Sequence, residues 1–311
     1  MIKKINLTHS FIFFIIINLF IFLNLIFSNF SITPFGCLLL ILLIGVTHGS
    51  LDHLKGKKLL SHYNISNTFY FYIAYIFIAS LIIILWLIFP AQLLIIFLIV
   101  AAYHFGKEDT QFLIPYTNYT NQLLFILKGS LIIFAPLYFN FAETIELFKL
   151  LLIENENFYT LLGKLEELKI FLIGVSLSSL ACLYLFLKNY EINKVTIFID
   201  YTSILLVNFY FSPLVAFTVY FCFLHSIRHI VNLIFELDKD NFLNGAKLFI
   251  IKSIPLTVLT GLLALLSLYF INFKVIFDDA IIKVIFIGLA SLTFPHILLE
   301  YLLEKNEKQK T

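Results

Sequence analysis

Six histidines lie inside, or at the ends of, strongly apolar segments, where ionisable side chains are rare. They are His48, His53, His104, His225, His229 and His296. A histidine within a membrane-spanning segment is costly unless it faces a partner or a cavity. Imidazole is also the commonest protein ligand of transition metals such as iron, copper and zinc. The sequence therefore predicts a shared metal centre inside the membrane.

The spacing of the histidines indicates which of them can bind the same ion. His225 and His229 are four residues apart, so on a helix they differ by about 40° in direction and can chelate one ion. His48 and His53 diverge by about 140° on a helix, so only one of them faces the ion unless the helix breaks near Gly49. We expect His48, the deeper of the two, to be the ligand.

The remaining histidines divide into one ligand candidate and several others. His104 is the only histidine of its segment and completes a set of four imidazoles, which favours iron or copper and, with an open position, O2 activation. His296 follows Pro295, which can break the local helix, and we expect it to ligate the metal, orient a ligand or contact substrate. His9 and His62 flank apolar segments and are expected to be solvated.

Acidic residues near these segments could orient the imidazoles by accepting a hydrogen bond from the second ring nitrogen. The candidates are Asp52, Glu108, Asp109, Asp200 and Glu300. Arg228, which lies between two of the histidines, also needs a partner, and Asp200 or Glu300 could provide it.

The composition identifies the class of protein. The chain has 311 residues, of which 61% are hydrophobic and 13% charged, and its mean hydropathy is +0.98. A soluble domain would have about a quarter of its residues charged. Its three cysteines are far apart and indicate neither a disulfide framework nor a thiolate site. No basic run points to nucleic acid. We expect an all-α, polytopic membrane protein that forms a single domain over residues 1–311.

Apolar runs of about 20 residues predict roughly eight to ten transmembrane helices, arranged around the metal site. The candidate spans are 10–29, 35–54, 69–89, 91–106, 122–141, 168–187, 195–211, 213–236, 247–271 and 281–303. Proline separates the third span from the fourth and the seventh from the eighth. Residues 142–167 mix apolar and charged side chains, which predicts an interfacial helical excursion.

The lysines orient the chain and relate the histidines to one another. Most lysines flank the same ends of the spans, so both termini are expected to be cytoplasmic, in a multi-pass protein of the inner membrane. Counted from the outer ends of the even-numbered spans, His48, His104, His225 and His296 lie about 12–15 residues in, or about 18–23 Å deep. Four helices thus bring histidine to nearly one depth.

Four histidine segments resemble the motifs of a known family. The segment GVTHGSLDH at 45–53 resembles the G-x-x-H-G-x-x-D-H motif of the Brp/Blh family of membrane β-carotene 15,15′-dioxygenases. The segments YHFG at 103–106, FLHSIRH at 223–229 and FPH at 294–296 resemble that family's later motifs, in the same order. The sequence departs from the family pattern at Thr47, where proline is expected, and at Lys107, where an acidic or small residue is commoner.

The resemblance implies that Fe(2+) and O2 cleave the central 15,15′ double bond of β-carotene to give two molecules of all-trans-retinal. It implies that the iron ligands are His48, His104, His225 and His229. Around them we expect residues that orient an imidazole or contact substrate, namely His53, Asp52, His296, Arg228, Tyr103, Glu108 and Phe223. The substrate would come from the lipid bilayer, and the retinal product suggests a microbial rhodopsin as a cellular partner.

Other readings of the histidine cluster lead to different functions. A histidine-ligated membrane hydroxylase or desaturase would usually have more histidines, in dense HxxHH boxes that this chain lacks. A metal transporter would place its ligands along a path, and a haem-binding electron carrier would show a Soret band. Histidines that merely join helices by hydrogen bonds would bind no metal.

Overall fold

Hydropathy predicted the membrane spans of this chain well. The computed structural model describes all residues except 1, 28–31, 115–118, 189–190 and 309–311. Within the described residues, ten helices or helical runs are long and apolar enough to cross a membrane, and there is no β-strand. The all-α, polytopic fold is therefore confirmed.

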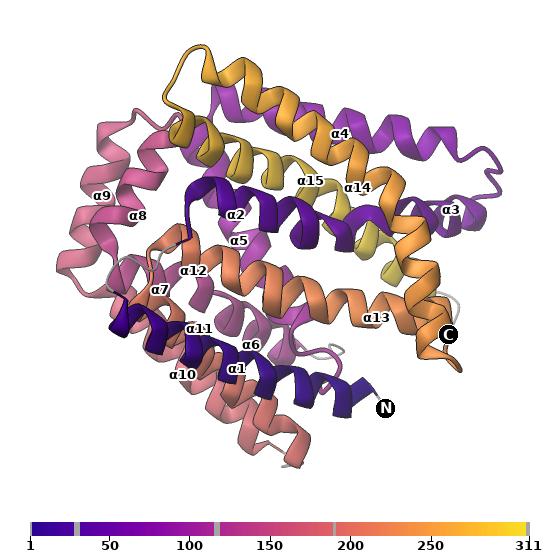
Figure 1. Cartoon of the computed structure of the whole chain (residues 1–311), viewed down its shortest axis with the longest axis horizontal. Coiled ribbons are helices and arrows are strands. Elements are labelled where there is room, and N and C mark those ends of the chain that lie inside the picture. Colours follow the sequence, from indigo (N-terminus) through magenta and orange to yellow (C-terminus); the bar gives the residue numbers. More distant parts are fainter. Residues whose placement is uncertain (1, 28–31, 115–118, 189–190, 309–311) are drawn as a thin grey trace.

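The helices follow one another with short connections (Figure 1). The first half of the chain contains α1 (Ile2–Ile26), α2 (Pro34–Leu40), η1 (Ile41–Gly45), η2 (Val46–Leu51), α3 (Asp52–His62), α4 (Phe69–Ile88), α5 (Pro90–Glu108), α6 (Tyr119–Gly129), α7 (Leu131–Phe139) and α8 (Phe141–Leu150). The second half contains α9 (Glu156–Glu167), α10 (Ile170–Leu187), η3 (Ile192–Lys194), α11 (Val195–Tyr210), α12 (Pro213–Val219), η4 (Tyr220–Ser226), α13 (Ile227–Leu237), α14 (Phe242–Asn272) and α15 (Phe277–Lys308).

Prolines act as predicted at two helix boundaries but not inside the last helix. Pro90 begins α5 and Pro213 begins α12, at positions where the missing N–H has no partner to lose. Pro295 was expected to be able to break its helix, yet α15 runs through it without interruption. His296 therefore keeps a helical relation to the residues one turn later.

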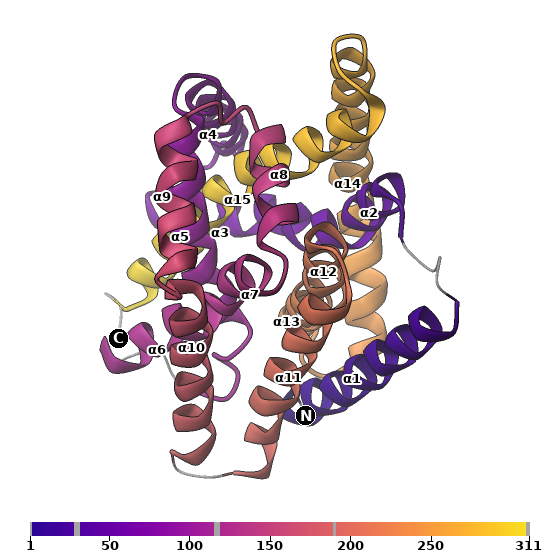
Figure 2. The same ribbon diagram turned by 90° about the vertical axis from the view of Figure 1, so that its left-hand side faces the viewer.

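The two helices between the fifth and sixth spans lie away from the chain ends. Residues 142–167 fall in α8 and α9, so the predicted helical excursion is present. These helices lie beside each other at one end of the bundle, whereas α1 begins and α15 ends toward the other end (Figures 1 and 2). Phe148 of α8 contacts Phe158 of α9, with ring centroids 6.4 Å apart.

Two glycines allow α5 and α6 to pack backbone against backbone. A Cβ atom added to Gly106 would overlap the Phe125 carbonyl group, and one added to Gly129 would overlap the Ala102 carbonyl group. Small residues of this kind permit close approach of membrane helices. Because His104 lies two residues before Gly106, this contact also fixes the position of a predicted metal ligand.

We expect the Gly106→Ala variant to be destabilised by about 1–3 kcal/mol, because the added methyl group must separate α5 from α6. Thermal unfolding of the detergent-solubilised protein measures this change. Gly261→Ala is the matched control, since nothing lies within 4 Å of the added atom. Equal losses of stability in both variants would contradict the close packing at Gly106.

Candidate metal centre

Five buried histidines from five helical elements meet in one cluster. His48 comes from η2, His104 from α5, His225 from η4, His229 from α13 and His296 from α15. Each is at most 8% exposed. Neighbouring ring centroids lie between 5.2 and 5.7 Å apart, in the closed order 48, 225, 104, 296, 229 and back to 48. The structure thus brings the four predicted ligands together and adds His296; metal binding itself stays a prediction.

The backbone is irregular where two of these histidines arise. The turn η1, just before His48, and the turn η4, which contains His225, are both π-helical. The short 3-10 helix η2 then carries His48 itself. Such π-helical turns are rare and often occur at functional sites. The regular α-helix is therefore interrupted before and at His48, although the helical run continues from Pro34 to His62.

Two adjacent acids at the end of α5 orient two of the histidines. Asp109 Oδ1 lies 3.2 Å from His225 Nδ1, and Glu108 Oε2 lies 3.2 Å from His229 Nδ1. Ionised carboxylates only accept hydrogen bonds, so each Nδ1 donates its proton. Burial by itself would raise the pKa of Asp109, but the hydrogen bond with His225 and the charges of Lys128 and Arg228 hold that pKa below its ordinary value.

A third carboxylate orients His296 in the same way. Both oxygens of Asp52 lie 2.9 Å from His296 Nδ1. Tyr75 donates its hydroxyl proton to Asp52 Oδ2 at 3.0 Å. His48 has a neutral partner instead, because its Nδ1 lies 3.1 Å from Ser226 Oγ. Three of the acids predicted to orient imidazoles, at positions 52, 108 and 109, therefore do so.

The ring nitrogens that remain suit a transition metal. The Nε2 atoms of His225, His229 and His296 are buried, and none has a hydrogen-bond partner among the described residues. An imidazole that donates from Nδ1 presents the lone pair of Nε2, which is the form that ligates metals. A buried nitrogen without a partner is costly, and coordination to a metal ion would satisfy it. The donor set fits iron.

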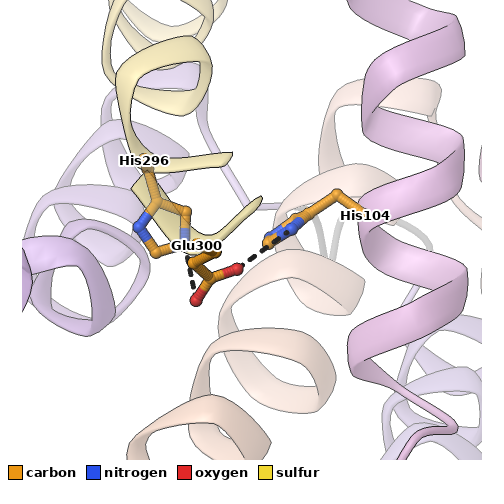
Figure 3. A group of neighbouring side chains, drawn as sticks. All are labelled: His104, His296 and Glu300. Carbon is orange, nitrogen blue, oxygen red and sulfur yellow. Dashed lines mark ion pairs between the residues drawn. The ribbon is translucent and has the colours of Figure 1, made fainter. Parts of the chain in front are cut away.

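Glu300, which the sequence suggested only as an acid that orients an imidazole or pairs with Arg228, has its carboxylate among the histidines. Its Oε2 is 3.7 Å from His104 Nδ1, and its Oε1 is 3.6 Å from His296 Nε2 (Figure 3). The same Oε1 lies 3.8 Å from His229 Nε2 and accepts a hydrogen bond from Lys55 Nζ at 2.9 Å. One donor atom each from His104, His296 and Glu300 lie within 4.8 Å of one another. Because Glu300 is four residues after His296, helical periodicity could have suggested this proximity.

Arg228 pairs with residues outside the ring of five histidines. Its guanidinium donates to Asp200 at 2.8 and 3.3 Å, to Ser10 Oγ at 2.9 Å and to the Asp109 carbonyl at 3.2 Å. Arg228 and Asp200 are each 1% exposed. Of its two predicted partners, Asp200 is therefore confirmed and Glu300 is wrong.

Several other predicted residues lie at the margin of the cluster or outside it. His53 is half-buried and its Nδ1 lies 3.0 Å from the Ser50 carbonyl oxygen, outside the ring of five histidines. Tyr103 and Phe223 are also half-buried. The expectation that His9 is solvated was wrong, because its Nε2 lies 2.9 Å from the Phe223 carbonyl oxygen in a partly buried contact. His62 is half-buried as well.

Two phenylalanine rings pack against the imidazoles of the cluster. Phe105 lies 4.6 Å from the His225 ring and Phe221 lies 5.7 Å from the His48 ring, measured between centroids. Both phenylalanines are buried. They place apolar side chains against the imidazoles of His225 and His48.

Comparison with known proteins agrees with the motif resemblance. The sequence model of the family described as beta-carotene 15,15′-dioxygenase matches residues 39–304, which include all five clustered histidines and Glu300. The chain belongs to this dioxygenase family. A curated relative from an uncultured marine bacterium (66A03), named beta-carotene 15,15′-dioxygenase, is 28% identical over 263 residues, covering 84% of this chain and 90% of the relative. No solved structure shows a significant match.

Asp109→Asn is expected to weaken the predicted iron binding by about 10–100-fold, the usual effect of removing a carboxylate that orients a ligand histidine. Iron retained per chain after dialysis against a chelator measures the change. Asp240→Asn, which alters an exposed aspartate, is the control. If both variants retained iron equally, Asp109 would have no part in orienting a ligand.

Proposed function

We propose that this protein cleaves the central 15,15′ double bond of β-carotene with O2, using Fe(2+), and releases two molecules of all-trans-retinal. One observation carries this proposal: the buried cluster in which carboxylates hold the imidazoles of His225, His229 and His296 with their Nε2 atoms free of hydrogen bonds. Membership of the dioxygenase family supports the substrate and the position of cleavage. His48, His104, His225 and His229 are the proposed iron ligands.

Iron(II) bound at the cluster would supply the activation of O2. The protein contributes the orientation of the ligands, because Asp109 and Glu108 fix the tautomers of His225 and His229. The rings of Phe105 and Phe221 keep water away from the imidazoles. Overall, one O2 and one β-carotene give two aldehydes, so the reaction balances without an external reductant.

The placement of the cluster suits a hydrocarbon substrate. β-Carotene dissolves in the bilayer, and the five histidines lie on segments that are apolar enough to cross it. A centre inside the bundle lets the polyene arrive from the lipid without crossing water. Both termini are proposed to be cytoplasmic, which agrees with α1 beginning and α15 ending toward the same end of the bundle (Figure 1). A microbial rhodopsin is a suitable acceptor of the retinal.

Expression in a bacterium that accumulates β-carotene tests the proposal. We expect the orange colour to fade and all-trans-retinal to appear on chromatography, in contrast to cells with an empty vector. Growth with iron chelated should suppress retinal formation. Unchanged β-carotene, in cells that contain folded and iron-loaded protein, would refute the substrate assignment.

A further inference from the structure

The last helix carries two donors that the predicted ligand set omits. His296 and Glu300 are four residues apart on α15, so they share one face of that helix. We propose that both are iron ligands and that, with His104 of α5, they form a set of two histidines and one carboxylate. This inference rests on the proposed function, because it concerns the same centre.

His296 has the surroundings of a ligand. Asp52 accepts a hydrogen bond from the Nδ1 of His296, and Tyr75 donates a hydrogen bond to Asp52. Its Nε2 is left buried and without a hydrogen-bond partner among the described residues, and the side chain is 5% exposed. This is the same arrangement as at His225, where Asp109 is the acceptor. Because the two histidines are oriented in the same way in one cluster, we expect both to be metal ligands.

The carboxylate of Glu300 lies between imidazole nitrogens at distances that suit shared coordination. Its oxygens are 3.7 Å from a nitrogen of His104 and 3.6 Å from a nitrogen of His296 (Figure 3), and 3.8 Å from a nitrogen of His229. These separations are too long for hydrogen bonds. Two donors that each lie about 2.1 Å from one ion are about 3.0–4.2 Å apart, depending on the angle between them. The observed distances fall inside that range.

The chemistry of this set suits the reaction. Two histidines and one carboxylate are the ligand types found in non-haem iron(II) oxygenases. A carboxylate also offsets part of the charge of a dication inside an apolar bundle, where neutral imidazoles alone would not. Glu300 is the carboxylate whose oxygens face the cluster while no imidazole is hydrogen-bonded to it.

A purely structural role for Glu300 makes a different prediction. Lys55 donates to Glu300 Oε1 at 2.9 Å, so Glu300 could serve only to neutralise Lys55. In that case, Glu300→Gln and Lys55→Met would each break one ion pair and leave iron affinity unchanged. If Glu300 is a ligand, Lys55 competes with the ion for its oxygen, and the two variants shift iron affinity in opposite directions.

Competition against a coloured chelator measures Fe(2+) affinity for the purified full-length protein in detergent. We expect Glu300→Gln and His296→Gln to weaken binding at least about 100-fold, beyond the usual effect of changing a residue that only orients a ligand. Lys55→Met is expected to tighten binding. Glu304→Gln, one turn further along α15 and paired with Lys107, is the control and should bind iron as the unchanged protein does.

X-ray absorption at the iron edge of the unchanged protein covers the case in which a variant fails to fold. The proposal requires a carboxylate oxygen in addition to imidazole nitrogens around the iron. Nitrogen ligands alone, or normal iron affinity in both Glu300→Gln and His296→Gln, would overturn it. If iron binding responds as expected but the unchanged protein leaves β-carotene intact, the proposed function fails and the ligand assignment stands.

Discussion

His225→Ala is expected to reduce retinal formation by more than about 100-fold, since changing a residue that merely orients a ligand already costs about 10–100-fold in activity or metal affinity. His225 is 1% exposed, contacts the His48 and His104 rings, and has a free Nε2. Alanine removes the proposed ligand and leaves Asp109 without its imidazole partner. Chromatography of retinoids from β-carotene-accumulating cells measures the loss, normalised to the amount of folded protein.

His62→Ala provides the matched control, because His62 lies at the end of α3 and outside the histidine cluster. It should form retinal at the level of the unchanged protein. Retinal formation by His225→Ala within a few-fold of that level would show that His225 is not a ligand. An equal loss in both variants would instead indicate a general effect on folding.

Arg228→Met is expected to lower the free energy of unfolding by about 3–5 kcal/mol, the usual cost of removing one partner of a buried ion pair. The change would leave the Asp200 carboxylate buried at 1% exposure without its guanidinium. It would also remove the hydrogen bonds to Ser10 of α1 and to the Asp109 carbonyl. Denaturant unfolding of the protein in mixed micelles measures the change.

The double variant Arg228→Met with Asp200→Leu separates the ion pair from other effects. Replacing both charged partners by apolar residues is often neutral or stabilising, so most of the lost stability should return. If the double variant were as unstable as Arg228→Met alone, the packing of the arginine, and not its charge pairing, would be what stabilises the bundle.

The spans were predictable because hydrophobicity and length are local properties of the chain. Ten apolar runs became ten helical spans, and the breaks at Pro90 and Pro213 occur where predicted. The meeting of His48, His104 and His225 was also foreseeable, since the predicted topology gave helices of the same direction a histidine at nearly one depth. Burial of polar side chains in apolar helices requires partners, and carboxylates supply them for His225, His229 and His296.

The parts that were not predicted depend on which helix faces are neighbours. In the sequence, Glu300 is simply an acidic residue near the end of the last span. Only the position of α15 beside α3 and α5 shows that its carboxylate faces His104. The pairing of Asp109 with His225 and of Glu108 with His229 likewise could not be assigned from sequence alone. His9 was misjudged because α1 packs across the carbonyl of Phe223.

Each π-helical turn holds one residue more than an α-helical turn would, and the extra residue completes the wider turn. Deleting one residue from Tyr220–Ser226 would therefore let the span become a regular α-helix while its two halves stay nearly in phase. The same deletion in Ile41–Gly45 would leave His48 facing its partners. Homologues that have lost a single residue in either turn are therefore expected to retain both the spans and the cluster, whereas a loss from a regular α-helical stretch would rotate its two parts by about 100°.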